Sequence, residues 1–126
     1  MKHAITYQGP LLFWCLVIYV VSSVHNVPTI PIALHPDKIA HMVVFGILGV
    51  TANRAFSHQS SFPSLALHAS IAAVLFAGLY GVVDELHQRA VPGRSFDIWD
   101  MVADVLGAAL FVWLLNKLRD RRAAAH

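Results

Sequence analysis

Residues 65–83 form the segment that most constrains the fold, because these nineteen residues contain no Asp, Glu, Lys or Arg. A helix needs about 20 mostly apolar residues to cross the roughly 30 Å of hydrocarbon in a bilayer. Hydrophobic residues make up 57% of the 126 residues and charged residues only 13%. A soluble domain of this size has too much surface to bury such an excess. We therefore predict an all-α integral membrane bundle of four transmembrane helices.

The four predicted helices cover about 9–27, 36–56, 65–88 and 97–118, within a single domain of residues 1–126. Prolines before residue 36, the polar segment 57–64 and the Pro92-Gly93 pair separate them. Pro36 suits a first helical turn, where its missing N–H does no harm. Asp97 is placed to cap the fourth helix, with Asp100 in the first turn. The first segment could instead be a cleaved signal peptide, although Lys2 alone makes a thin positive region.

The distribution of Lys and Arg predicts the orientation in the membrane. Six of these residues fall on the side of the two termini and three on the other side, so we expect both termini in the cytoplasm. The acid-rich loops would then face outward. Small residues recur every four positions in the third and fourth segments, which predicts that these two helices pack closely. The small residues are Ala69, Ala73, Ala77, Gly81, Ala103 and Gly107.

Some functions are disfavoured by composition. Cys15 is the only cysteine, so no intramolecular disulfide or cysteine-based zinc site can form. The basic residues are concentrated in the tail and are not interleaved with aromatics, which argues against nucleic-acid binding. The bilayer is the expected partner, and the sequence leaves the oligomeric state open.

The acids gather in one region. Six of the seven lie between Asp84 and Asp104 or at Asp37, and ionisable groups in a membrane usually face a protein interior or a water-filled site. Helical spacing places three of them on one face of the fourth helix, and Asp37 on one face with His41 and Phe45. The catalytic candidates are Asp84, Glu85 and His41, and the ligand-binding candidates are Lys38, Gln88, Arg94, Asp37, Asp97, Asp100 and Asp104.

The carboxylates need compensation. Asp84 and Glu85 lie near a helix C-terminus, where the helix dipole disfavours acids, and Asp104 is predicted about 10 Å deeper than Asp97. Arg94, Lys38 or protonated His41 or His87 could supply positive charge. A divalent metal is another option, with Asp84, Glu85, Asp100 and Asp104 as its ligands if present. Simpler roles stay open too: helix capping for Asp97 and Asp100, and snorkelling to head groups for Arg89.

Three stretches resemble the VanZ-like membrane protein family, named for the teicoplanin-resistance protein VanZ. They are Asp37-Lys38-Ile39-Ala40-His41-Met42-Val43-Val44-Phe45, Asp84-Glu85-Leu86-His87-Gln88, and Val91-Pro92-Gly93-Arg94 followed by Asp97, Asp100, Asp104 and Gly107. The resemblance covers about residues 34–115. Many members carry an asparagine close after the position of Asp104, and this chain does not.

The resemblance implies a small integral membrane protein of the prokaryotic cell envelope, with an effect on teicoplanin sensitivity in the founding member. Three functions are consistent with the residues. The site could bind or process an envelope lipid or lipid-linked precursor, with Glu85 or His41 as general acid or base. It could be a non-catalytic scaffold or ligand-binding protein whose polar cluster is a structural ion-pair network. A transporter or proton relay ranks third.

Overall fold

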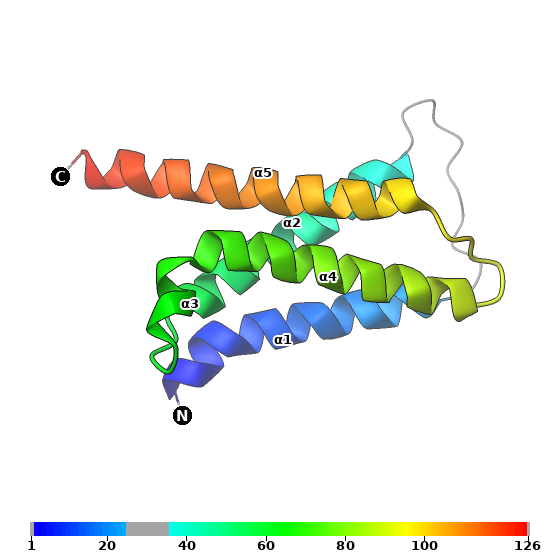
Figure 1. The fold of residues 1–126 in the computed structure, drawn as a ribbon, viewed down its shortest axis with the longest axis horizontal. Helices are drawn as coiled ribbons and strands as arrows, with labels where there is room; N and C mark the ends of the chain where they lie inside the picture. Colours follow the sequence, from blue (N-terminus) through cyan, green and yellow to red (C-terminus); the bar gives the residue numbers. More distant parts are fainter. Residues whose placement is uncertain (1, 25–35, 126) are drawn as a thin grey trace.

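The computed structural model describes residues 2–24 and 36–125. These residues form helices and no strand: α1 (Lys2–Ser22), α2 (Pro36–Ser57), the short α3 (Pro63–Leu67), α4 (Ala69–Ala90) and α5 (Ile98–Ala123). The long helices α1, α2, α4 and α5 are each long and apolar enough to cross a membrane. They alternate in direction, so the two termini lie at the same end of the bundle (Figure 1). The predicted all-α membrane bundle is confirmed.

The bounds of three of the four predicted helices were wrong. The first helix begins at Lys2 rather than near residue 9, and ends at Ser22; the predicted residues 25–27 lie outside the described residues. Its early turns are held by α2, since Gln8 Nε2 donates to the carbonyl oxygen of Ala55 at 3.1 Å. The predicted third helix is two helices, because the chain leaves helical geometry at His68 between α3 and α4. The fourth helix runs on to Ala123, five residues beyond its predicted end.

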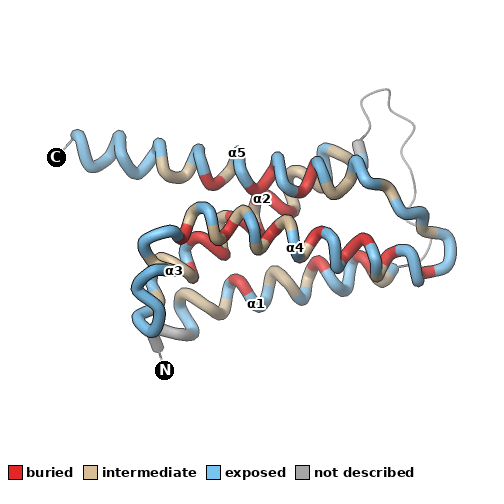
Figure 2. Tube along the Cα trace, viewed as in Figure 1, coloured by how far each residue is buried: buried red, intermediate tan, exposed pale blue. Residues whose placement is uncertain are grey.

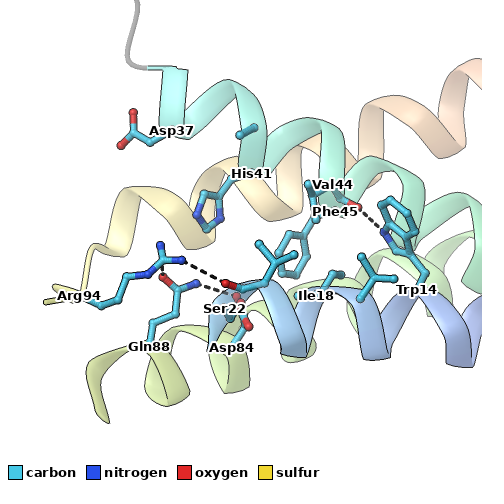
Figure 3. A pocket seen from close by; sticks show the side chains of 13 residues that line it. Trp14, Ile18, Ser22, Asp37, His41, Val44, Phe45, Asp84, Gln88 and Arg94 are labelled. Carbon is cyan, nitrogen blue, oxygen red and sulfur yellow. Dashed lines mark hydrogen bonds between the residues drawn. The ribbon is translucent and has the colours of Figure 1, made fainter. Parts of the chain in front are cut away.

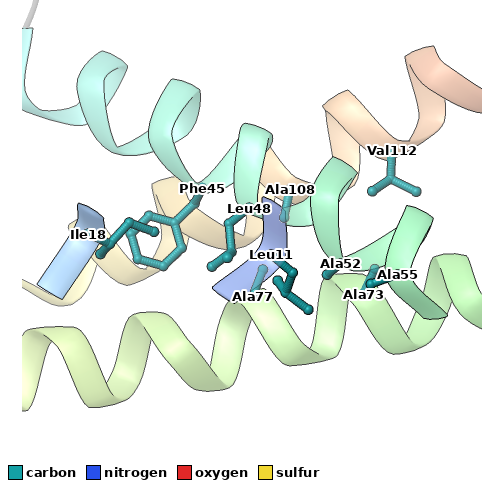
Figure 4. Packing of buried hydrophobic residues seen from close by; sticks show 10 residues of the cluster. All are labelled: Leu11, Ile18, Phe45, Leu48, Ala52, Ala55, Ala73, Ala77, Ala108 and Val112. Carbon is teal, nitrogen blue, oxygen red and sulfur yellow. The ribbon is translucent and has the colours of Figure 1, made fainter. Parts of the chain in front are cut away.

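Buried residues face the centre of the bundle (Figure 2). Many of the exposed residues are large and apolar. The core is made of residues from all four long helices: Leu11, Ile18, Phe45, Leu48, Ala52, Ala55, Ala73, Ala77, Ala108 and Val112 (Figure 4). A core so rich in alanine lets helices approach closely. An apolar exterior of this kind is what a bilayer solvates.

Glycine and alanine set the closest helix contacts. The predicted packing of α4 on α5 is confirmed, with Gly81 against Asp104 and Gly78 against Val105. Gly107 makes a closer approach, to α2: a Cβ at this position would lie 2.1 Å from the carbonyl oxygen of Met42. The α2–α5 contact therefore requires a residue without a side chain here, and it brings the first turns of both helices together.

Candidate ligand-binding site

The first turns of α2 and α5 are joined by Lys38. Its ammonium group lies 2.6 Å from Asp97 Oδ2, 2.5 Å from Asp100 Oδ1 and 3.3 Å from Asp37 Oδ2. These acids occupy helix N-termini, where the helix dipole favours negative charge. Asp97 is also the N-cap of α5 and accepts a hydrogen bond from the backbone N–H of Trp99 at 2.8 Å. The predicted capping by Asp97 is confirmed.

Asp97 has a lowered pKa as a result of these contacts. Its carboxylate lies just before the apolar segment of α5, at 37% side-chain exposure. The hydrogen bond from Lys38 is the largest cause, followed by the one from the Trp99 backbone. Both stabilise the ionised form, so the pKa falls below its ordinary value.

One turn deeper, His41 pairs with Asp104. His41 Nδ1 lies 2.8 Å from Asp104 Oδ1, and His41 Nε2 lies 3.7 Å from Asp100 Oδ2. Asp104 is only 1% exposed, so the imidazole supplies the partner that a buried carboxylate needs. The His41 ring stacks on Phe45, with centroids 6.2 Å apart. We call Asp37, Lys38, His41, Asp97, Asp100 and Asp104 the ion-pair network.

Glu85 is compensated in a way that the sequence does not reveal. Its carboxylate is 1% exposed and accepts a hydrogen bond from the backbone N–H of Asp97 at 2.6 Å. The C-terminal end of α4 is thereby tied to the start of α5. The positive partner is the unpaired amide of a helix N-terminus, where the sequence had suggested a cationic side chain. No signal in the sequence could have found this contact, because it depends on the path of residues 91–97.

Arg94 is placed by a turn that ends α4. Gly93 has φ 83°, a conformation that glycine adopts without strain, and the Arg94 N–H donates to the Val91 carbonyl oxygen at 3.2 Å. The turn directs Arg94 back toward Gln88, whose Oε1 lies 3.4 Å from Arg94 Nη1. Gln88 in turn donates to Asp84 Oδ2 at 2.8 Å. Arg94 Nη2 lies 3.4 Å from the Val21 carbonyl oxygen, while the buried Nε has no partner among the described residues.

These three side chains form the polar end of a cavity of about 250 Å³ between α1, α2 and α4 (Figure 3). Asp37, His41 and Ser22 also line it. Its other walls are mainly apolar, formed by Trp14, Val17, Ile18, Val21, Ala40, Val44 and Phe45. Trp14 donates its indole N–H to the Val44 carbonyl oxygen at 2.9 Å and so joins α1 to α2 along one wall. We call this space the α1–α2–α4 cavity.

Apart from Glu85, the predicted site residues therefore fall into two groups at the same end of the bundle, the cavity and the ion-pair network. Asp84, Gln88 and Arg94 belong to the cavity, His41 and Asp37 belong to both groups, and Glu85 does not line the cavity. Lys38 was predicted to bind a ligand, but its ammonium group is engaged by carboxylates. The contribution of α1 was missed, because α1 is apolar on every side and shows no face preference in its sequence.

The possible metal ligands Asp84, Glu85, Asp100 and Asp104 do not fit one ion. Within residues 2–24 and 36–125, no three His, Cys, Asp or Glu side chains are grouped so as to hold a metal. Each of these acids instead has its own partner: Gln88 for Asp84, the Asp97 amide for Glu85, Lys38 for Asp100 and His41 for Asp104. The chemistry available at the site is hydrogen bonding by Arg94, Gln88 and Asp84 at the end of an apolar cavity.

The fold and the site define a multi-pass membrane protein with a polar centre at one end of a four-helix bundle. The VanZ/LLP1 family model matches residues 9–119, and the chain belongs to this family. The chain is also similar to Uncharacterized protein C11E3.10 of Schizosaccharomyces pombe, with 30% identity over 96 residues. That match covers 75% of the chain and 54% of the relative, so the chain spans about half of that protein's length. No solved structure matches the chain.

Proposed function

We propose that this VanZ/LLP1 protein binds an envelope lipid or a lipid-linked precursor, with its polar head group in the α1–α2–α4 cavity. The observation that carries the proposal is the arrangement of Arg94. Its Nε is buried without a partner among the described residues, at the polar end of a cavity whose remaining walls are mostly apolar. A buried donor without an acceptor is costly. A ligand that accepts from this guanidinium would remove the cost.

The chemistry of the cavity favours an amphiphile with an anionic head group. The guanidinium fork suits a phosphate or a carboxylate, and Gln88 and Asp84 offer further hydrogen bonds beside it. An acyl chain would contact Val17, Ile18 and Val44. α1, which forms one wall of the cavity, exposes Leu12, Phe13, Leu16 and Val20 on its outer face, so lipid would contact the other side of this wall.

The orientation in the membrane is part of the proposal. The excess of Lys and Arg at the end that holds both termini favours the cytoplasm for that end, which places the polar end of the cavity toward the periplasm or the cell exterior. A green fluorescent protein fused after residue 126 should then fluoresce in cells, whereas alkaline phosphatase fused there should be inactive. Active alkaline phosphatase would contradict the orientation.

The binding test is native mass spectrometry of protein purified in mild detergent, followed by identification of the lipids released. We expect a co-purified anionic lipid that Arg94→Ala loses. Arg89→Ala is the matched control, because Arg89 lies at the same end, is exposed and does not line the cavity. Equal retention of lipid by wild type and Arg94→Ala would contradict the proposal. The same variants, expressed in cells and grown with teicoplanin, test the resistance that the family name suggests.

Catalysis at the same cavity is the second candidate, favoured by the presence of both Asp84 and His41 on its lining. Together they could act as acid and base on a bound head group. The test is product formation by the purified protein from a panel of lipid-linked substrates, with Asp84→Asn as the variant. Full turnover by Asp84→Asn would exclude this acid–base role. Binding without product in the wild type would leave the protein as a binder.

A structural role is supported for the ion-pair network. Lys38 and His41 compensate the carboxylates of α5 from α2, which is the arrangement expected of a network that fixes helix register. We therefore assign the network to holding α2 against α5 and the cavity to the ligand. A transporter or proton relay stays the weakest candidate, since the motif residues gather at one end of the bundle.

A further inference from the structure

The opposite end of the bundle carries a second hollow, of about 300 Å³, lined by Tyr7, Val50, Arg54, His58, Leu115 and Arg119. It lies between the first turns of α1 and the last turns of α2 and α5. Among the described residues, none that lines it is acidic. It is therefore separate in position and opposite in charge from the acid-rich end that carries the α1–α2–α4 cavity.

Tyr7 orders two of the basic side chains. Its ring stacks on His58 with centroids 4.1 Å apart and an interplanar angle of 9°, and Arg54 Cζ lies 5.3 Å from the centroid of the same ring. Cation–π contacts of this kind hold a guanidinium in place without using its N–H donors on a carboxylate. Neither Arg54 nor Arg119 makes an ion pair within the described residues.

Basic residues at helix C-termini are ordinary, since they complement the helix dipole. The dipole alone does not require two helices to place their arginines around one hollow, or an aromatic ring from a third helix to hold one of them. The depth of the hollow in the membrane is also informative. Trp113 is exposed, and Lys117 Nζ lies 4.6 Å from its ring centroid, a combination typical of the head-group region of a bilayer.

We propose that this hollow, the basic pocket, binds the phosphate of an anionic phospholipid of the surrounding leaflet. Arg54 and Arg119 contact the phosphate oxygens, and the glycerol and acyl portions extend toward Val50 and Leu115. The occupant is a lipid because the pocket lies at head-group level on a bundle whose exterior is apolar. This binding is independent of the ligand proposed for the α1–α2–α4 cavity.

The test uses full-length protein in neutral detergent, supplied with equal amounts of phosphatidylglycerol and phosphatidylcholine, with bound lipid counted by native mass spectrometry. Salt is kept high enough to screen attraction by the exposed tail. We expect the wild type to retain phosphatidylglycerol preferentially. Arg54→Ala/Arg119→Ala should reduce that retention by about fivefold or more for each arginine removed. Arg54→Lys/Arg119→Lys, which keeps the charge but loses the fork, should fall in between.

Arg121→Ala/Arg122→Ala is the matched control, because it removes the same charge from exposed positions outside the pocket. We expect this control to retain phosphatidylglycerol as the wild type does. Equal losses in the pocket and tail variants, or no preference in the wild type, would overturn the proposal. Displacement of the lipid by inorganic phosphate would assign the pocket to a soluble anion and would overturn the lipid assignment. Arg94→Ala should lose the lipid of the α1–α2–α4 cavity and still retain phosphatidylglycerol in the basic pocket, whereas Arg54→Ala/Arg119→Ala should do the reverse, which separates the two sites.

Discussion

His41 Nδ1 and Asp104 Oδ1 lie 2.8 Å apart and join the second turn of α2 to the second turn of α5 inside the bundle. Asp104 is almost fully buried, and in the part of the chain that the structure describes His41 is the side chain that hydrogen-bonds it. The pair lies beside the close contact between Gly107 and the Met42 backbone, on the side nearer the first turns of α2 and α5. Charge pairing and close backbone packing therefore act on the same helix contact.

His41→Ala leaves the Asp104 carboxylate buried without its partner, and we expect it to lower the free energy of unfolding by about 3–5 kcal/mol. Reversible unfolding in mixed detergent micelles measures the change. His41→Ala/Asp104→Ala removes both groups and should cost less than the two single variants together. Strictly additive effects would show that the two side chains do not interact.

Gly107→Ala tests the contact between α2 and α5. The added methyl group would overlap the Met42 backbone, which cannot move aside as a flexible side chain could. We expect a loss of at least about 1–3 kcal/mol in the free energy of unfolding. Gly9→Ala is the control, because a Cβ there meets nothing within 4 Å and alanine favours a helix by about 1 kcal/mol. A Gly107→Ala variant as stable as Gly9→Ala would contradict the packing.

Asp97 makes the stability of the bundle sensitive to acid. Its pKa is lowered in the folded protein by Lys38 and by the Trp99 backbone, so ionisation of Asp97 contributes stability that is fully present above the unfolded value. This contribution is lost as the pH falls through the lower folded value. The melting temperature should therefore fall as the pH drops below about 4, the ordinary pKa of an aspartate.

Asp97→Asn cannot ionise, and its melting temperature should fall less over the same range. The comparison of wild type with Asp97→Asn isolates this residue from the other carboxylates of the chain. Parallel curves for the two proteins would show that the hydrogen bonds to Asp97 do not contribute to acid sensitivity.

Glu85 is expected to act through its hydrogen bond to the Asp97 amide. Glu85→Ala leaves that N–H without its acceptor, at a cost of about 1–3 kcal/mol, whereas Glu85→Gln keeps an acceptor oxygen and should cost less. Amide hydrogen exchange at the start of α5 should accelerate more in Glu85→Ala than in Glu85→Gln. If both variants were equally affected, the charge of Glu85 would matter more than its acceptor oxygen.

The sequence predicts the bundle and the grouping of its charges, for identifiable reasons. Apolar segments of transmembrane length fix the helices, and spacing by three and four residues places Asp97, Asp100 and Asp104 on one face. Helical spacing within α2 likewise predicts that His41 and Phe45 share a face. These features are local, so they can be seen without knowing how the helices pack.

Features that depend on packing between helices could not be predicted in the same way. The sequence offered several cations for Asp84 and Glu85, and the structure compensates them with Gln88 and a backbone amide. The cavity requires α1, whose uniformly apolar sequence does not say which side faces the bundle. The position of Arg94 depends on the turn at Gly93. The direction in which this turn points the Arg94 side chain depends on how α4 packs in the bundle.

His41 has a further consequence, because the same imidazole borders the cavity and holds Asp104. A ligand bound beside the His41 ring contacts a side chain that already hydrogen-bonds Asp104 of α5. Rotation of the ring would weaken that hydrogen bond. Occupancy and helix association are therefore thermodynamically linked. A ligand that leaves the imidazole in place raises the free energy of unfolding of the bundle. A ligand that rotates the imidazole away from Asp104 weakens the association of α2 with α5.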